Sequence, residues 1–589
     1  MDAPSKVTVL ATDVLVIGGG LAGCMAAIKA REHDVDVLIA EKANTLSSGQ
    51  AGSGIDHIWG YFPPVHRRMG WTLDDLVEDH MQGVAHGFAL PELIGFIAEE
   101  MHDRLLDLEK FGLKIRYPDS PLPGNFRMVY QFHSVPSSLN VDGRSLKVKL
   151  TREVKKRGIG IINRVMVTKL LTQDGQICGA LGVGTRNAGI YLFKAKSVIL
   201  STGGKTGRMG RESTGSVRFN LHLPGNLSAD GKTMALKAGL PVANMEFLGA
   251  SRYGLANYET AGRPPGNTWQ PAAAIVNAAG ETVVPKGSFP QWGNLEKGYR
   301  IDAAQTRRQW LENGGITPLG MPSRKDLKLA GPFYVDCTQA SEAEIDYVEW
   351  ALSNEGKCNQ LLRHLKEEKV DLRSDRLELG LGSREVGNLA ASGLLVDANM
   401  ETPIKALFAA GDEVGGAPFG ASPAAFTTGW RAGDMAGRLV KTLRPPSMDA
   451  KNEIDTLKQR CLEMLSPGDG FTWYEVEDTL QNIMDTYCGD IKTGAMLKRG
   501  LARVHTIRQQ PVKVSNAHEL CRALEVMSLI ENAEMILRTS LARSESRKHP
   551  CSFQRVDFPE QNDREWFAFS TISLKHGEYN LSKIHLGAS

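Results

Sequence analysis

This chain of 589 residues lacks the features that define several protein classes. Its eight cysteines are scattered without a CxxC pair, so the sequence offers no evident ligand set for zinc or an iron–sulfur cluster. No apolar run reaches the ~18 residues that a membrane-spanning helix needs. The net charge of +2 gives no general attraction for nucleic acid.

These absences set the first expectations. With 42% hydrophobic and 23% charged residues, the composition is that of an ordinary globular protein. We expect no metal, no membrane insertion and no nucleic-acid partner. The scattered cysteines, and an N-terminus without a signal-like segment, indicate a reducing compartment and hence a cytoplasmic location. The length predicts more than one domain.

The sequence does contain a glycine-rich turn between two predicted strands. An apolar strand leads into GGGLAG at residues 18–23, and a helix and a second strand follow. Gly18 permits a tight turn, Gly20 lets the backbone approach a pyrophosphate, and Gly23 allows close helix–strand contact. Glu41, at the end of the second strand, is placed to accept from ribose hydroxyls. The spacing predicts a dinucleotide site.

Two segments after Glu41 are candidates for the same site. Residues 42–55 are rich in Ser and Gly, and we expect a loop that wraps the cofactor, because small residues let backbone amides approach a ligand. Residues 56–68 contain Trp59, Tyr61 and two histidines. They either line a pocket or cap a core, and the sequence favours neither.

The segment from residue 164 to residue 200 changes to a two-residue period. It predicts short strands at 165–172, 177–183 and 190–195, separated by turns, and then a buried strand at 197–200. This meander before a returning parallel strand resembles flavoproteins with two dinucleotide-binding motifs. Simple NAD dehydrogenases differ from it, so we expect FAD.

Several short motifs follow one another in a fixed order. They are STGG (201–204), SADGKTMA (228–235), NMEF (244–247), AIVNAAG (274–280), LFAAGDE (407–413), AAFTTGWRAGDMAG (424–437) and LARSESR (541–547). Together they look like the flavoprotein subunits of the fumarate reductase/succinate dehydrogenase superfamily. Within it, Gly411-Asp412 and the Gly382-Ser383 stretch resemble the adenylylsulfate reductase alpha subunit.

The resemblance implies an α/β fold with a Rossmann-like FAD-binding domain, an inserted β-meander, a capping (substrate) domain and a C-terminal helical region. The expected divisions are 1–246 and 376–445 for the FAD-binding domain, 247–375 for the capping domain, and 446–589 for the helical region and tail. It also implies an iron–sulfur partner subunit. The predicted cofactor-binding residues are Gly18, Gly19, Gly20, Ala22, Gly23, Glu41, Lys42, Ser48, Gly49, Val167, Thr202, Gly203, Asp230, Asp412, Ala425 and Phe426.

Departures from the family pattern bear on the substrate and on the cofactor link. Residues 246–253 contain no substrate histidine, and Arg384 stands where a second one is expected. An arginine-rich proton-delivery segment is missing between residues 280 and 335. We therefore do not expect a dicarboxylate site. The family histidine that bonds to flavin would fall near Gly49, which offers no imidazole, so we expect non-covalent FAD.

Arg252, Tyr253 and Arg384 remain as candidate catalytic residues. The arginines suit an anionic substrate or the reduced flavin, although both would equally serve as structural ties between domains. Arg208, Arg211 and Arg218 form a basic segment that we interpret as solvated surface.

We therefore expect an FAD-dependent oxidoreductase that moves two electrons between a small anionic substrate and flavin. One alternative is a sulfur-metabolising flavoprotein like adenylylsulfate reductase. Another is a non-catalytic FAD-binding subunit of a redox complex. A flavoprotein that modifies nucleic acid is disfavoured by the near-neutral charge.

Overall fold

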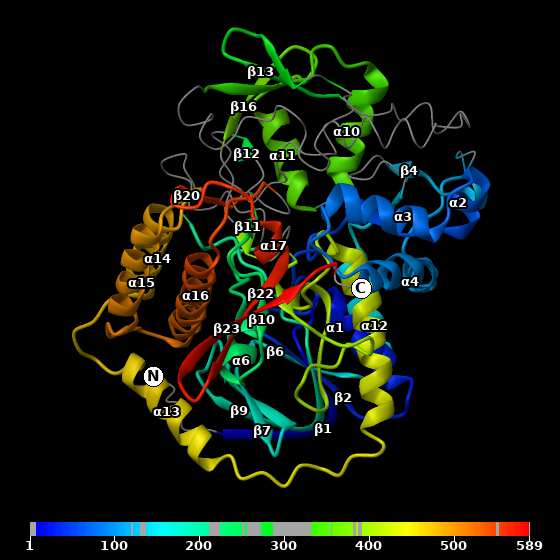
Figure 1. Ribbon diagram of the computed structural model, residues 1–589. Helices are drawn as coiled ribbons and strands as arrows, with labels where there is room; N and C mark the ends of the chain where they lie inside the picture. Colours follow the sequence, from blue (N-terminus) through cyan, green and yellow to red (C-terminus); the bar gives the residue numbers. More distant parts are fainter. Residues whose placement is uncertain are drawn as a thin grey trace.

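The computed structural model describes residues 7–118, 120, 122–129, 137–210, 224–249, 254–255, 272–284, 286, 331–354, 356–380, 385–386, 391–548 and 553–587. The body of the molecule surrounds one large sheet. A smaller unit of strands and two helices lies above it, and a group of helices lies beside it (Figure 1).

The large sheet mixes a parallel half with an antiparallel meander. Its order is β6-β2-β1-β9-β8-β7, and β19 also pairs with β9. β6, β2, β1 and β9 run parallel, as does β19, while β7, β8 and β9 form the meander. The strands are β1 (Val7–Ile17), β2 (Val37–Glu41), β6 (Gly160–Asn163), β7 (Val165–Gln173), β8 (Gln176–Gly184), β9 (Ile190–Leu200) and β19 (Leu407–Ala409).

β9 corrects one expectation. The sequence predicted separate strands at 190–195 and 197–200, but β9 is a single strand of 11 residues. β1 runs beside its whole length, from Val7 opposite Ile190 to Ile17 opposite Leu200. Its first half pairs with β8 and its last residues pair with β19, so one strand belongs to both halves of the sheet.

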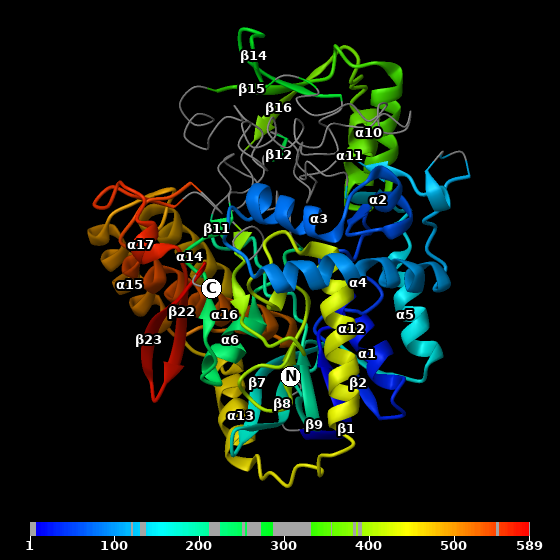
Figure 2. The same ribbon diagram turned by 45° about the vertical axis from the view of Figure 1, so that its right-hand side comes forward.

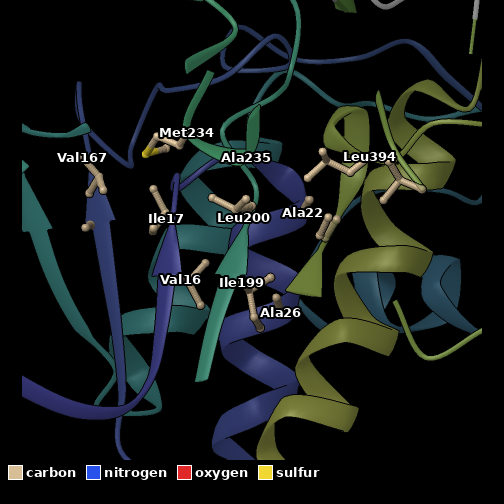
Figure 3. Packing of buried hydrophobic residues seen from close by; sticks show 14 of the residues in the cluster. Val16, Ile17, Ala22, Ala26, Val167, Ile199, Leu200, Met234, Ala235 and Leu394 are labelled. Carbon is tan, nitrogen blue, oxygen red and sulfur yellow. The ribbon is translucent and has the colours of Figure 1, made fainter. Parts of the chain in front are cut away.

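Two helices pack closely beside the parallel strands. Helix α1 (Leu21–Arg31) lies along α12 (Ala421–Leu439) (Figure 2). A Cβ added at Gly429 would lie 2.5 Å from the Ala22 carbonyl oxygen, and one at Gly433 would lie 2.2 Å from that of Ala26. Glycines on α12 therefore allow backbone contact. Figure 3 shows the core beside them, where Val16, Ile17, Ile199 and Leu200 lie near Ala22 and Ala26.

A second group of elements borders the sheet. Two helices follow one another here, separated by a π-helical turn (His80–Val84) and a loop that ends before Pro91. Thr72 and Asp75 begin the first of them with a capping box. The elements are β3 (His57–Trp59), β4 (Met128–Val129), β5 (Ser138–Asn140), α2 (Pro63–Met69), α3 (Leu73–Asp79), α4 (Pro91–Lys110) and α5 (Leu146–Lys156).

The upper unit has its own hydrophobic core. Its antiparallel sheet has the order β12-β16-β15-β13-β14, and its buried residues include Ile275, Val335, Ile345 and Leu361. This cluster is separate from the main core. The elements are β12 (Gly254–Leu255), β13 (Ala274–Asn277), β14 (Thr282–Val284), β15 (Phe333–Asp336), β16 (Arg376–Gly380), α10 (Glu342–Asn354) and α11 (Gly356–Glu367).

The C-terminal part is helical, as expected, but ends in a β-hairpin that the sequence analysis did not predict. The hairpin completes a sheet of order β18-β10-β22-β23. Its turn, His576-Gly577, has φ of 53° and 82°, the signature of a two-residue hairpin loop. The elements are α13 (Lys451–Leu465), α14 (Trp473–Tyr487), α15 (Gly494–Arg508), α16 (Ala517–Ala542), α17 (Asp563–Trp566), β10 (Val242–Ala243), β18 (Gly393–Leu394), β20 (Ile491–Lys492), β21 (Gln554–Arg555), β22 (Ala568–Lys575) and β23 (Glu578–His585).

Arg543 joins this C-terminal part to the body. Its guanidinium is fully buried and lies 2.7 Å from both Glu246 Oε1 and Glu545 Oε1. It also lies over the ring of Phe247, at 4.7 Å, and over that of Trp566, at 5.0 Å.

Among the described helices, none is long and apolar enough to cross a membrane.

Candidate cofactor site

The glycine turn has the geometry that a dinucleotide phosphate needs. Gly18 has φ +101°, and a Cβ there would lie 2.5 Å from the Ser201 carbonyl oxygen. A Cβ at Gly23 would lie 1.9 Å from the Gly18 carbonyl oxygen, so helix and strand meet there. A Cβ at Gly20 would meet no protein atom within 4 Å. The N-cap of α1 has no side-chain hydrogen bond, which leaves its first amides for an anion.

A large cavity opens at this turn, with about 1630 Å³ of space between protein atoms and at its mouth. Most of the predicted cofactor residues line it, although the chain brings them from α1, β2, β7, α6 (Asp230–Lys237) and α12 and from loops between elements. They are Gly18, Gly20, Ala22, Glu41, Lys42, Gly49, Val167, Thr202, Gly203, Asp230, Asp412 and Ala425. A cavity of this volume, bounded by uncapped helix amides, fits an extended dinucleotide.

Four predicted cofactor residues are not among those that line the cavity: Gly19, Gly23, Ser48 and Phe426. Gly19 N–H donates to Glu41 Oε2 at 2.6 Å, and its carbonyl oxygen accepts from Ser48 Oγ at 3.1 Å. Phe426 is fully buried in the core. Gly19 and Ser48 therefore hold the wall in place, and Glu41, which lines the cavity, is oriented by a backbone amide.

Lys42 lies in a buried ionic network. Its ammonium is 2.7 Å from Asp230 Oδ2, 3.0 Å from Ser228 Oγ and 2.9 Å from Glu525 Oε1 on α16. Burial alone would lower the pKa of Lys42, but Asp230 and Glu525 outweigh it and raise the pKa above its ordinary value. These three acceptors match the three donors of an ammonium, so Lys42 fixes Asp230 in the cavity wall.

Arg208 extends this network and corrects the interpretation of the basic segment as solvated surface. Its guanidinium is buried, 2.5 Å from Glu477 Oε2 on α14 and 2.8 Å from Glu525 Oε2 on α16. Arg208 therefore forms structural ion pairs that join the body to the C-terminal helices. Arg211 and Arg218 lie outside the described residues.

The other end of the cavity is formed by β3 and the start of α12. Asp56, His57 and Trp59 line it, as do Phe419 and Ser422. Trp59 Nε1–H donates to the Phe419 carbonyl oxygen at 3.0 Å, and His57 Nδ1 lies 2.6 Å from Asp56 Oδ1. The sequence left open whether this segment lines a pocket or caps a core. In the structure its first part lines the cavity and its later part does not.

Tyr61 belongs to the part that does not line the cavity. Its hydroxyl donates to the Trp71 carbonyl oxygen at 3.4 Å, and its ring stacks on that of His66.

At the start of α12, Phe419 and Ala421 have φ of 54° and 45°, a conformation that non-glycine residues seldom adopt. Such strain is common where a backbone is held against a ligand.

His80 supports the same end from behind. Its ring lies 5.1 Å from that of Trp59, and its Nε2 is 3.0 Å from the Pro418 carbonyl oxygen. Burial lowers the pKa of His80 to about 4, although the Pro418 carbonyl acts in the opposite direction. His80 is therefore neutral at pH 7 and uses its N–H to hold the backbone that precedes α12.

Sequence reasoning missed the charged side chains behind Asp412. Glu413 is fully buried and accepts from Thr202 Oγ1 and from Gly204 N–H, the latter at 3.1 Å. Lys205 Nζ lies 2.9 Å from Asp412 Oδ1. Lys232 on α6 is fully buried and donates to the Gly204 carbonyl oxygen. No local pattern indicates these contacts, because the partners come from segments far apart in sequence.

The candidate catalytic residues Arg252, Tyr253 and Arg384 lie outside the described residues. Their neighbours are described: β11 (Leu248–Gly249) pairs with β17 (Glu385–Val386), with Gly249 opposite Glu385. This pairing lies between the upper unit and the body (Figure 1).

The described residues contain no group of three or more His, Cys, Asp and Glu side chains that could hold a metal ion. Six buried cysteines take part in no disulfide: Cys24, Cys178, Cys337, Cys461, Cys488 and Cys521.

Comparison with known proteins agrees with this geometry. Residues 13–378 match the family described as FAD binding domain, and residues 477–586 match the one described as fumarate reductase flavoprotein C-term. A fumarate reductase (CoM/CoB) chain of Methanothermobacter marburgensis is 26% identical over 94% of this chain and 95% of its own length. The alpha subunit of adenylylsulfate reductase from Megalodesulfovibrio gigas is 23% identical over 95% of this chain and 92% of its own length.

A solved structure shows the same fold. Adenylylsulfate reductase from Archaeoglobus fulgidus superimposes with a TM-score of 0.79 at 23% identity, over 99% of this chain and 98% of that one. The predicted fold class and the predicted cofactor, FAD, are confirmed. The family match covers more than half of the chain, and it includes the cavity-lining residues from Ile17 to Asp230, whereas those at 410–425 lie beyond it. The chain thus belongs to the FAD binding domain family and is an FAD-dependent oxidoreductase of the fumarate reductase/succinate dehydrogenase flavoprotein superfamily.

Proposed function

We propose that FAD lies extended along the cavity, with its pyrophosphate at the N-terminus of α1. The adenosine part would lie toward Glu41 and Asp230, and the ring system toward Trp59 and the start of α12. The uncapped amides of α1 and the empty space at Gly20 support this placement. The N-terminus of the 19-residue helix α12 adds a positive dipole at the ring end. FAD supplies the two-electron chemistry when it is bound.

We also propose that the FAD is not covalently attached. The loop at the expected attachment point carries Gly49 and Gln50 on the cavity, and neither has an imidazole. His57 is the imidazole among the described residues that line the cavity. Acid precipitation should release all of the flavin. If yellow colour stays in the pellet, the same treatment of His57→Gln decides whether His57 forms the link.

For the reaction, we propose two-electron transfer between the FAD and a small anionic substrate. Arg252 and Arg384 would supply the cations. The pairing of β11 with β17 supports this, because the chain just before Arg252 lies beside the chain just after Arg384. Fumarate and adenylylsulfate, in the names of the relatives, are both anions. Arginine binds carboxylates and related oxyanions in a bidentate way.

Within the described part of the site, the Asp56–His57 pair is the proposed group for proton movement. Asp56 is almost fully buried, and its carboxylate would hold the His57 ring in one orientation at the cavity surface. A histidine oriented by a carboxylate is suited to accept or deliver a proton. Trp59 and Phe419, joined by a hydrogen bond, would keep water from this end of the cavity.

An iron–sulfur partner, and the location of the protein, belong to the same proposal. The relatives described above are named as subunits of their enzymes, which supports a role within a larger complex. The chain's own superfamily supports an iron–sulfur protein as the partner. Six cysteines that take part in no disulfide support a cytoplasmic location. The domain division at residues 246, 375 and 445 is proposed on the same resemblance, with the separate core of the upper unit in its favour.

A second candidate is a sulfur-metabolising activity like that of adenylylsulfate reductase. The 23% identity to its alpha subunit over nearly the whole chain favours it, together with Gly411-Asp412. Arg384, which replaces the histidine of that family, counts against a direct transfer of its activity.

Anaerobic photoreduction of the purified protein, followed by addition of single oxidants, tests these proposals. Fumarate, adenylylsulfate and oxygen are added separately, with and without the proteins that co-purify with the chain. Reoxidation by one anion supports the proposed reaction, and Arg384→Gln should slow it while the flavin is retained. Reoxidation only when an iron–sulfur protein is added supports the partner. Rapid reoxidation by oxygen alone would instead indicate a self-contained oxidase.

A further inference from the structure

Four charged side chains gather behind the cavity wall that residues 201–203 form: Lys205, Lys232, Asp412 and Glu413. We call them the charge cluster. Lys205 has 2% of its surface exposed, and Lys232 and Glu413 have none. Asp412 alone lines the cavity. A set of two cations and two carboxyls, so fully removed from water, is costly unless its members compensate one another.

Lys205 connects the charge cluster to the cavity surface. Its ammonium lies 2.9 Å from Asp412 Oδ1 and donates to Gln50 Oε1 at 3.4 Å. Asp412 and Gln50 both line the cavity. Only the Asp412 or Gln50 side chain therefore separates the Lys205 ammonium from a ligand in the cavity. Because Lys205 is buried, little water screens its charge from that ligand.

Lys232 and Glu413 form the deeper half. Lys232 donates to the Gly204 carbonyl oxygen, and the Gly204 amide donates to Glu413 Oε1 at 3.1 Å. Thr202 Oγ1 donates to the same carboxylate oxygen. The other oxygen, Oε2, is buried without a hydrogen-bond partner among the described residues. This carboxyl therefore has room for a proton.

Both deep groups are displaced toward their neutral forms. Burial lowers the pKa of Lys232 to about 8, against the attraction of Glu413 and Asp412 and with the repulsion of Lys205. Burial raises the pKa of Glu413, against the attraction of Lys232, and the nearby charge of Asp230 acts in the same direction as burial. A change of charge in the cavity therefore alters their protonation easily.

Other elements add few charges around this pair. Helix α16 packs against α6, and its Glu525 is paired with Lys42 beside Asp230. Its Asn532, which is uncharged, donates to Thr233 Oγ1 at 3.1 Å. The charge cluster therefore lies beside a second ionic network, in which Lys42, Asp230 and Glu525 are paired with one another.

We propose that the charge cluster binds a proton when the cofactor gains two electrons, and so sets the reduction potential of the FAD and its pH dependence. The inference rests on FAD occupying the cavity as proposed above. The two electrons come from the reductant, and one proton accompanies them to the cofactor. A second proton comes from solvent to Lys232 and Glu413. Negative charge that arrives in a poorly hydrated cavity favours the protonated cluster.

The midpoint potential of the FAD-loaded full-length protein, measured against redox dyes under nitrogen from pH 6 to pH 9, tests this. In the wild type, more than one proton per two electrons should be taken up near pH 8, where Lys232 titrates. Near pH 6, Lys232 is protonated in both states and contributes no proton to the count. Glu413→Gln and Lys232→Met should take up one proton throughout.

Lys232→Met and Lys205→Met should also weaken the preference for reduced over oxidised FAD about tenfold, which is about 30 mV for a two-electron couple. Lys205→Met serves alone if Lys232→Met does not fold. The matched control is Lys237→Met, on the same helix: its side chain is 41% exposed and pairs with Glu531. This variant should keep the wild-type potential and slope.

A wild-type slope of one proton at every pH, with unchanged potentials in the variants, would overturn the inference and leave the charge cluster a structural feature. Loss of bound FAD from Lys205→Met and Glu413→Gln would overturn it as well, because the cluster would then serve binding. These outcomes do not depend on the substrate. A failure of every anion to reoxidise the protein would contradict the proposed function and leave the measured potentials valid.

Discussion

Lys42, which follows the second strand of the sheet, lies 2.9 Å from Glu525 on α16, a helix of the C-terminal region. Lys42 lines the cofactor cavity, whereas Glu525 is fully buried between helices. The same carboxylate pairs with Arg208 and Arg522. The C-terminal helices are therefore part of the construction of the cofactor site.

We expect Glu525→Gln to lower the free energy of unfolding by about 3 kcal/mol, because it leaves three cations without their shared carboxylate. Urea denaturation of the FAD-loaded protein measures this, and flavin retention should fall in parallel. Glu463→Gln on α13 is the control, because Glu463 is exposed, and a change within about 0.5 kcal/mol is expected there. Equal stability of the two variants would show that the network contributes little.

Gly20→Ala should weaken FAD binding at least tenfold and leave the apoprotein stable. The added Cβ meets no protein atom within 4 Å, but it enters the space assigned to the pyrophosphate. Flavin content after dialysis, and thermal unfolding with and without FAD, separate the two effects.

Gly95→Ala on α4 is the control for this prediction. Its Cβ would meet only Val77 Cγ2, at 3.7 Å, away from the cavity. Full flavin content in both variants would contradict the proposed position of the pyrophosphate.

Acid should weaken the protein partly through His80. Burial lowers the pKa of His80 to about 4, below the ordinary 6.5 that applies in the unfolded chain. The unfolded state therefore binds a proton first as the pH falls. Stability that is complete above pH 6.5 is lost between pH 6.5 and pH 4, by up to about 3 kcal/mol.

Denaturant unfolding of the wild type and of His80→Gln at pH 7 and pH 4.5 measures this loss. Gln can still donate to the Pro418 carbonyl oxygen and does not titrate, so the variant should lose less stability on acidification. His518→Gln, at an exposed position, should behave like the wild type. An equal acid effect in all three proteins would contradict the role of His80.

His57→Gln and Asp56→Asn should retain FAD and lower the rate of the substrate reaction by about 10²-fold or more, because proton transfer loses its oriented base. Rapid-mixing reoxidation of the photoreduced protein measures this rate. Tyr61→Phe removes a hydroxyl that bonds Trp71 outside the cavity wall, and it should keep the wild-type rate.

Features that depend on neighbouring residues were predictable from the sequence. The turn at residues 18–23 and the acid at Glu41 follow from local spacing, and the structure brings most of the predicted cofactor residues to one cavity. The hairpin at His576-Gly577 also has a local signal, a histidine and glycine between two strand-like runs. It was missed because residues 446–589 were assigned to a helical region and tail on the family resemblance alone.

Features that depend on distant residues were not predictable. Arg208 reads as surface beside other arginines, yet Glu477 and Glu525 bury it. Lys232 reads as an ordinary helix residue, and only the fold places it beside Glu413. An ion pair between segments hundreds of residues apart leaves no periodic pattern in the sequence of one chain.

The C-terminal hairpin has a consequence for how the protein is made. β22 pairs with β10, and β10 pairs with β18. In β18, Leu394 forms a β-bridge with Val414, the residue that follows Asp412 and Glu413 in the sequence. A ribosome must therefore deliver the chain as far as Lys575 before this sheet can close. Until then, the emerging polypeptide exposes an unpaired strand edge, the kind of surface on which chaperones act and aggregation begins.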